Sequence, residues 1–271
     1  MLNLMKFGAV LLLAATAILT VSAPAQAQLR APNDAGMAWG HWHFTAKDVD
    51  AQTAFWKTLG GVPVENGPLK MISFPGTLIL MRKADSVEPT IGSNVNHVGF
   101  FVKDLAAAKA KWAAAGLNLD IANPTAVNFF INGPDGIRIE IYENKTLDTP
   151  ISSHHTHFFA ADPVAERDWY MKWFGGTAGK RNGSETDQIP GMELAFIASK
   201  DKLAPTKGRA LDHIGFEVKN LPAFVAKLKA AGIKLDIEPR TLPNTNTMIC
   251  FITDPWGTYI ELTENLAPPA K

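Results

Sequence analysis

The strongest constraint on the fold is an internal repeat that occurs four times. Each copy opens with a short segment containing His41, His97, His155 or His213, and these histidines are 56, 58 and 58 residues apart. Seven residues after each histidine comes an Asp or Asn, and a helical pattern then runs to a glycine. These residues favour the N-cap and the C′ position of a helix, so each copy predicts a strand followed by a capped helix. The cap pairs are Asp48 and Gly60, Asp104 and Gly116, Asp162 and Gly175, and Asn220 and Gly232.

The second part of each copy has the pattern of short strands. Residues 127–132 and 137–142 are β-rich runs separated by a four-residue Gly-Pro turn, and residues 248–253 and 258–263 repeat the arrangement. Such pairs predict hairpins. Each copy is therefore predicted to be a βαβββ module of the α+β class, and two modules pairing edge to edge would form a curved sheet with a concave, cup-shaped face.

The modules alternate between two types. Copies one and three open with His-x-His-Phe, whereas copies two and four read His-Val-Gly-Phe and His-Ile-Gly-Phe. This A-B-A-B order favours a duplication, with one cup from residues 39–147 and a second from residues 152–265. Residues 28–38 would precede the first domain, and residues 266–271 would form a C-terminal tail.

The first 27 residues have the pattern of a secretory signal peptide. Lys6 precedes an apolar run at residues 7–21, and residues 25–27 read Ala-Gln-Ala. Fifteen apolar residues are fewer than the roughly 20 needed to span a bilayer, which argues against a membrane anchor. We therefore expect cleavage after Ala27 and a periplasmic or secreted protein that does not stay in the membrane.

The remaining composition excludes several classes of partner. Without Lys6 the chain has 25 basic and 26 acidic residues, and no basic stripe occurs, which argues against nucleic acid as a partner. The single cysteine, Cys250, lies in an apolar run and is interpreted as a buried strand residue rather than a nucleophile. A small molecule is the expected partner, and oligomeric state stays open.

The candidate chemistry lies in the opening and closing strands. Residues two apart in a strand share a face, so His41 and His43 lie together, as do His155 and His157. A carboxylate on the inward face of a strand is costly unless it is paired or binds a metal. Two glutamates in equivalent closing strands of the B modules meet that description, Glu140 and Glu261.

One A and one B module together supply two histidines and one glutamate. The positions in the A modules that correspond to the two glutamates are Leu80 and Ala195, so those modules contribute histidine alone. Two histidines and a carboxylate form a facial triad, which suits Fe(II) and also accepts Mn(II), Zn(II), Co(II) or Ni(II). Whether His41 or His43 is the ligand stays open, although the spacing from Asp48 favours His41.

The alternative interpretation is that these histidines only form hydrogen bonds in their strands, or that duplication preserved them after a metal was lost. Their distribution argues against it, because every histidine of the chain lies in an opening strand. The set is His41, His43, His97, His154, His155, His157 and His213.

These features resemble the vicinal oxygen chelate superfamily, which includes glyoxalase I, extradiol dioxygenases and the fosfomycin and bleomycin resistance proteins. The resemblance runs from about Gly40 to Asn265 and is carried by the His-x(6)-Asp openings, the helices ending in Gly-Gly and the closing Ile-Glu strands. It implies one metal site per pair of modules. The implied ligands are His41, His97 and Glu140 in the first domain, and His155, His213 and Glu261 in the second.

The chain departs from two families within that superfamily. Extradiol dioxygenases carry a Tyr where this chain has Phe251, and an acid/base His where residues 244–247 read Asn-Thr-Asn-Thr. Glyoxalase I has a fourth protein ligand that Leu80 and Ala195 cannot supply, and its glutathione adduct is scarce outside the cytoplasm.

Other residues are candidates for acid/base and substrate-binding roles. His43 and His157 are suited to move a proton, or else form the pocket wall. Tyr259 and Tyr142 would orient a substrate oxygen, and Arg138 shares a face with Tyr142. We expect a metal-dependent enzyme acting on a small oxygenated molecule in a dioxygenase-like reaction. The alternatives are a lyase or isomerase on a substrate without glutathione, and a non-catalytic binding protein of the bleomycin-resistance type.

Overall fold

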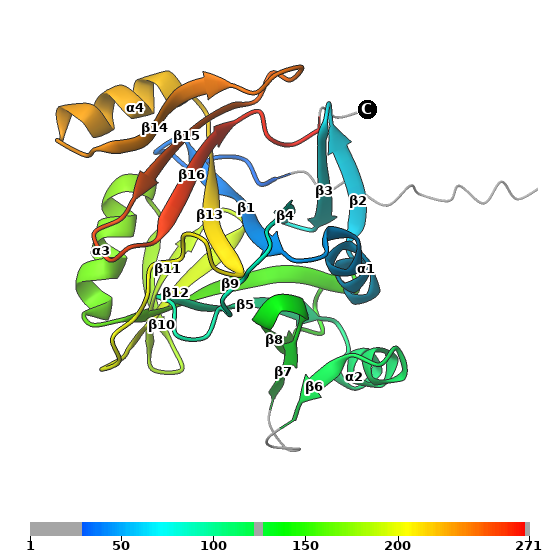
Figure 1. Cartoon of the computed structure of the whole chain (residues 1–271). Helices are drawn as coiled ribbons and strands as arrows, with labels where there is room; N and C mark the ends of the chain where they lie inside the picture. The colour runs from blue at the N-terminus through cyan, green and yellow to red at the C-terminus, as the bar shows by residue number, and fades with distance from the viewer. Residues whose placement is uncertain (1–28, 122–126, 269–271) are drawn as a thin grey trace, which may run out of the picture.

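The computed structural model describes residues 29–121 and 127–268, so the expected signal peptide lies outside the described residues. The chain folds as four successive βαβββ modules (Figure 1), which confirms the α+β class. Module one contains β1 (Met37–Ala46), α1 (Val49–Leu59), β2 (Val62–Asn66), β3 (Leu69–Phe74) and β4 (Thr77–Lys83). Module two contains β5 (Val95–Val102), α2 (Leu105–Ala114), β6 (Asn118–Asp120), β7 (Asn128–Asn132), the 3₁₀ turn η1 (Pro134–Gly136) and β8 (Arg138–Glu143).

The second half repeats this order. Module three contains β9 (Ile151–Ala160), α3 (Pro163–Phe174), β10 (Thr177–Arg181), β11 (Ser184–Ile189) and β12 (Met192–Ala198). Module four contains β13 (Leu211–Val218), α4 (Leu221–Ala230), β14 (Leu235–Thr241), β15 (Met248–Thr253) and β16 (Tyr259–Glu264). The two predicted hairpins are present as β7–β8 and β15–β16.

The four α-helices in the described residues all begin at the N-caps that the repeat predicts. The side chains of Asp48, Asp104, Asp162 and Asn220 accept hydrogen bonds from backbone N–H groups three residues later, at 2.9, 2.8, 3.1 and 3.0 Å. Each such cap contributes about 1 kcal/mol to its helix. Because every opening strand runs directly into its capped helix, the histidine occupies the same place in each module.

The strands form two eight-stranded sheets, each built from one A and one B module. The first sheet has the order β14-β15-β16-β13-β1-β4-β3-β2 and therefore combines modules one and four. The second has the order β10-β11-β12-β9-β5-β8-β7-β6 and combines modules two and three. Antiparallel pairs join the modules, β1 with β13 and β5 with β9. The predicted pairing of module one with two, and of three with four, is wrong.

The repeat alone does not decide this pairing, because either A module offers the same free strand edge to either B module. The chain changes sheets in the segments that follow β4 and β12. These two segments run beside each other through parallel bridges between Glu88 and Arg209 and between Ser93 and Ala204. The two crossing segments are thus hydrogen-bonded to each other. As a result, residues 39–147 and 152–265 each contribute half of both sheets.

The faces of the sheets opposite the strand histidines share one hydrophobic core. Trp42 of β1 lies 5.4 Å from Phe100 of β5 between ring centroids, and its Nε1 donates to Thr156 Oγ1 of β9 at 2.9 Å. Phe174 of α3 stacks on Phe216 of β13 at 3.9 Å. Because side chains alternate along a strand, burying Trp42 here turns His41 and His43 to the outer, open face. Among the described residues, no helix is long and apolar enough to cross a membrane.

Candidate metal centres

Each sheet brings three histidines and one glutamate together on its open face. In each set, one ligand atom from every residue lies within 4.8 Å of the others. We call cup one the face of the first sheet that carries His41, His43, His213 and Glu261. We call cup two the face of the second sheet that carries His97, Glu140, His155 and His157.

In cup one, two imidazoles converge on a single carboxylate oxygen. Nε2 of His41 lies 2.9 Å from Glu261 Oε2, and Nε2 of His213 lies 3.0 Å from the same atom. The other nitrogen of His213, Nδ1, lies 2.7 Å from Asp212 Oδ1. With Nδ1–H donating to Asp212, Nε2 keeps its lone pair free for a metal. Arg82 in turn holds Asp212 through an ion pair of 2.7 Å.

Cup two repeats the arrangement with different support. Nε2 of His97 and Nε2 of His155 each lie 3.1 Å from Glu140 Oε2. An amide takes the place of the aspartate, because Nδ1 of His97 lies 2.9 Å from Asn96 Oδ1. Asn128 donates a hydrogen bond to the second oxygen of Glu140, Oε1. Oε2 of Glu140 is therefore directed at the two histidines, and Oε1 is held by the hydrogen bond from Asn128.

Burial and these contacts shift the pKa values of Glu261, Glu140 and His155 in the direction that metal binding needs. The contacts with His213 and His41 hold the pKa of Glu261 well below its usual range, against the effect of burial. Contacts with His155 and His97 lower the pKa of Glu140 in the same way. Burial lowers the pKa of His155 to about 3. Ionised carboxylates beside neutral imidazoles form the donor set that a divalent metal requires.

His213 differs from the other clustered histidines. Burial acts to lower the pKa of His213, but its hydrogen bonds with Asp212 and Glu261 outweigh that effect and raise it. A metal ion at Nε2 would replace the proton that these two carboxylates attract. The donor set of cup one thus fits a cation.

The six expected ligands assemble in combinations other than those predicted. His41 shares its cup with His213 and Glu261, not with His97 and Glu140. His155 joins His97 and Glu140, and not His213 and Glu261. The cause is the crossed pairing of modules, since each A module meets the B module of the opposite half of the chain.

The two additional histidines differ in their surroundings. His43 lies beside His213 with ring centroids 4.4 Å apart, and both of its ring nitrogens are buried with no hydrogen-bond partner among the described residues. Burial lowers the pKa of His43 well below its ordinary value. His157 lies 4.5 Å from His97 between ring centroids, and its Nε2 is 3.5 Å from Ser184 Oγ. His43 thus has both ring nitrogens available to bind a ligand, whereas Nε2 of His157 already contacts Ser184.

The predicted substrate-binding residues also face the cups. Tyr259 stacks on Phe251 at 4.8 Å and lies edge-on to His213 at 5.7 Å. Tyr142 lies 6.3 Å from His155 between ring centroids. The guanidinium of Arg138 stacks over the ring of Phe130 at 3.9 Å. Tyr259 thus belongs to cup one, whereas Tyr142 and Arg138 belong to cup two.

Sequence reasoning missed several residues that support the clusters. Asp212 and Asn96 stand directly before the B-module histidines, and this repeated Asp or Asn was the available signal for their role. Asn128 and Ser184 had no signal, because their places opposite the cup residues depend on strand register. His154 enters cup two at an irregularity between β5 and β9, stacked on Phe101 at 3.7 Å.

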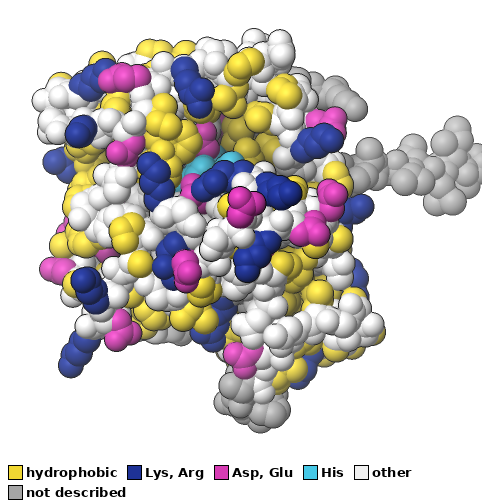
Figure 2. All heavy atoms as spheres, in the orientation of Figure 1, with side chains coloured by type: hydrophobic (Ala, Val, Ile, Leu, Met, Phe, Trp, Pro, Cys, Tyr) yellow, Lys and Arg dark blue, Asp and Glu magenta, His cyan; other side chains and the backbone are white. Residues whose placement is uncertain are grey.

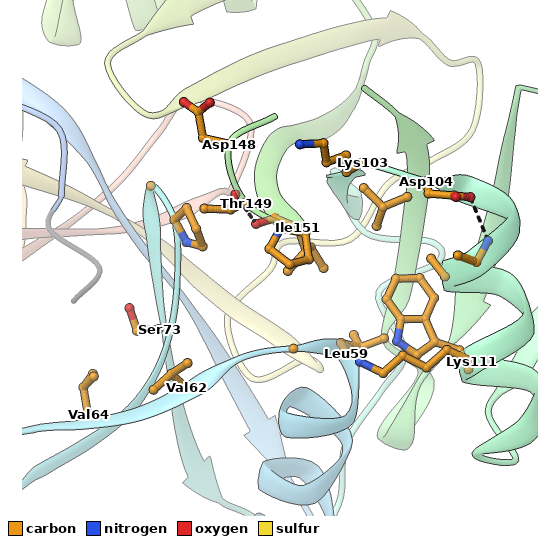
Figure 3. A pocket seen from close by; sticks show the side chains of 18 of the residues that line it. Leu59, Val62, Val64, Ser73, Lys103, Asp104, Lys111, Asp148, Thr149 and Ile151 are labelled. Carbon is orange, nitrogen blue, oxygen red and sulfur yellow. Dashed lines mark hydrogen bonds between the residues drawn. The ribbon is translucent and has the colours of Figure 1, made fainter. Parts of the chain in front are cut away.

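The surface of the molecule is hollowed over the first sheet. Figure 2 shows histidine side chains at the bottom of this hollow, hydrophobic side chains around it, and Lys and Arg side chains along one side of its opening. A different cavity, of about 1000 Å³, lies apart from both clusters, and Leu59 of α1, Ile151 and Lys111 of α2 surround it (Figure 3). The described residues that line it include neither histidine nor glutamate, so it is no candidate for the metal chemistry.

Comparison with known proteins agrees with this architecture. Residues 152–262 match the family model of the Glyoxalase/Bleomycin resistance protein/Dioxygenase superfamily. That segment covers modules three and four, and so half of each cup. No curated protein sequence matches the chain.

Two solved structures share the fold over most of the chain. Glyoxalase I from Zea mays aligns with a TM-score of 0.66 and 17% identity, covering 84% of this chain and 92% of that one. A “putative dioxygenase” from Bacillus subtilis aligns with a TM-score of 0.68 and 14% identity, covering 90% of this chain and 87% of that one. At these identities the similarity establishes the fold, and the reaction has to be argued from the cups.

Proposed function

We propose that this chain, which carries a domain of the glyoxalase, bleomycin resistance protein and dioxygenase superfamily at residues 152–262, binds one divalent metal ion in each cup and acts on a small oxygenated organic molecule. The observation that carries the proposal is the convergence of two imidazole Nε2 atoms on one carboxylate oxygen in both cups, at 2.9–3.1 Å.

His41, His213 and Glu261 would hold the ion in cup one, and His97, His155 and Glu140 would hold it in cup two. This donor set suits Fe(II) first, with Mn(II), Zn(II), Co(II) and Ni(II) as alternatives. When bound, the metal would supply Lewis-acid polarisation of a substrate that chelates through two oxygens. Three protein ligands leave positions open for such a substrate.

The protein's own groups would orient the substrate and move protons. His43 is neutral and buried, and neither of its ring nitrogens has a partner within the described part of the chain, so it is placed to accept a proton from a substrate hydroxyl. The same nitrogens would allow His43 to serve as a further ligand. Tyr259 and Phe251 form an apolar wall that would exclude water beside His213.

A dioxygenase-like reaction is the proposed chemistry, and a lyase or isomerase reaction is the alternative. Leu80 occupies the position of a fourth glyoxalase ligand and cannot bind a metal. This favours the dioxygenase-like reaction, because it leaves more of the metal open to substrate and dioxygen. A chain that binds no metal would instead be a binding protein for a small ligand.

The test is metal analysis followed by turnover assays. We expect about two equivalents of metal per chain after anaerobic purification without chelators. Oxygen consumption matched to the loss of a catechol-like substrate would support the dioxygenase reaction, whereas conversion without oxygen would favour the lyase or isomerase. Absence of metal after reconstitution with each candidate ion would overturn the proposal.

We also propose that the protein is exported and acts in the periplasm or outside the cell, on the evidence of the pattern at residues 1–27. Intact-mass analysis of protein from an extracytoplasmic fraction should give a chain that begins at Gln28. A full-length chain confined to the cytoplasm would contradict this.

A further inference from the structure

The strand registers allow the two cups to be compared position by position. Leu78 pairs with His41 in the first sheet, and Glu193 pairs with His155 at the same place in the second. In the neighbouring strands, Met71 pairs with Leu80 and Thr186 pairs with Ala195. Positions that are equivalent in the fold therefore carry side chains of different chemistry.

Cup one is lined by apolar side chains on both sides of its histidines. One cluster consists of Met71, Leu78, Leu80 and Leu266, with Leu69 and Val64 packed against it. The other consists of Ile249, Phe251 and Tyr259, with Ile237 and Leu242 packed against it. Both clusters are separate from the main core. The walls around the cup-one metal ligands therefore favour an apolar group on the substrate.

Cup two has polar residues at six of these positions, whereas Ala195 replaces Leu80. The replacements from cup one to cup two are Leu78 to Glu193, Met71 to Thr186, Leu69 to Ser184, Ile249 to Asn128, Ile237 to Asp120 and Tyr259 to Arg138. Of the aromatic wall, only Phe251 keeps an aromatic equivalent, Phe130. An apolar substrate group would be buried against these polar side chains without offering them hydrogen bonds, which weakens its binding in cup two.

Two arginines in cup two have donors that nothing among the described residues satisfies. Arg181 donates through Nε to Glu193 at 2.6 Å, but its Nη2 is buried and has no partner. Arg138 lies 3.8 Å from Asp120, and its Nε is likewise buried and without a partner. Guanidinium groups bind carboxylates through pairs of N–H donors, so these free donors match an anionic oxygen of a ligand.

We infer that the two cups take different ligands: an apolar chelating molecule in cup one, and a chelating molecule that also bears a carboxylate in cup two. The inference rests on the proposed function, because both molecules would be held through the metal. Arg138 determines the specificity of cup two, and Tyr259 is its counterpart in cup one.

The experiment uses two probes with the same chelating group, 4-tert-butylcatechol and 3,4-dihydroxybenzoate. Each cup is isolated within the full chain: His41→Gln with Glu261→Gln empties cup one, and His155→Gln with Glu140→Gln empties cup two. The proteins are loaded with Co(II) under anaerobic conditions, and the Kd of each probe is measured from the change in visible absorption. Circular dichroism establishes that each variant is folded, and His213→Gln and His97→Gln provide second routes to emptying the cups.

With cup one alone intact, 4-tert-butylcatechol should bind at least about tenfold more tightly than 3,4-dihydroxybenzoate. With cup two alone intact, the order should reverse, and Arg138→Gln should abolish that reversal. Lys145 is an exposed cation outside the cups. Lys145→Gln is therefore the matched control and should leave the Kd of both probes unchanged. If both cups rank the probes in the same order, this inference is overturned while the metal proposal stands. If neither variant retains cobalt, the proposed function fails, and this inference fails with it.

Discussion

The imidazole of His41 occupies the space that a side chain at Gly215 would fill. A Cβ added to Gly215 would lie 1.9 Å from His41 Cε1, and one added to Gly99 would lie 2.1 Å from the same atom of His155. These are cross-strand partners in the two strand pairs that join the modules. The glycine two residues after each B-module histidine is therefore required by the histidine of the partner module.

Gly215→Ala should displace His41 and remove the metal from cup one, while cup two keeps its own. Gly99→Ala should do the reverse, so each variant is the control for the other. The measurement is metal content per chain after dialysis, and about one equivalent is expected for either variant. Two equivalents in both variants would show that the close packing of these histidines does not matter for metal binding.

Asp212→Asn should weaken metal binding in cup one by about 10–100-fold, the usual effect of losing a partner that orients a metal-binding histidine. The reason is that Asp212 accepts from Nδ1 of His213 and fixes the direction of Nε2. Cup two carries Asn96 at this position, so its affinity should already be the lower of the two. Competition with a chromophoric chelator measures both affinities, and an unchanged cup-one affinity in Asp212→Asn would contradict the role of Asp212.

Glu166→Gln should stabilise the chain at pH 8. Glu166 is fully buried in α3, neither carboxylate oxygen has a partner among the described residues, and burial with the nearby charge of Asp254 raises its pKa to about 9. A raised carboxyl pKa means that the folded state binds the proton more tightly. Stability is therefore lost as pH rises from the ordinary value of 4.5 towards 9.

We expect Glu166→Gln to raise the free energy of unfolding by about 1–3 kcal/mol at pH 8 and to change it little at pH 5. Urea unfolding of the metal-free chain at both pH values measures this, so that metal affinity does not enter. Glu238→Gln, at an exposed residue, is the control. An equal change at pH 5 and pH 8 would show that the Glu166 carboxylate is not the cause.

The repeat made the modules, their helix caps and the clustered histidines predictable, because these depend on local sequence. Asp48 caps α1, and the equivalent Asp or Asn caps the helix in each of the other copies. The pairing of modules was not predictable from the repeat, because it depends on where the chain crosses between sheets. Sequence therefore identified His41 and Glu261 as candidates but assigned them to different cups.

The different linings of the cups were hidden for a related reason. Tyr259 and Arg138 were both candidates for substrate binding, but their equivalence appears only when the registers of the two sheets are compared. Asn128 contacts Glu140 from an adjacent strand, and no local pattern marks such a residue.

The most direct test is the metal content of two double variants, His41→Gln/Glu261→Gln and His41→Gln/Glu140→Gln. Because His41 and Glu261 share cup one, the first variant should lose one equivalent and keep the ion of cup two. The second variant affects both cups and should bind no metal. The opposite result, one ion in the second variant and none in the first, would contradict the crossed pairing of modules on which this account rests.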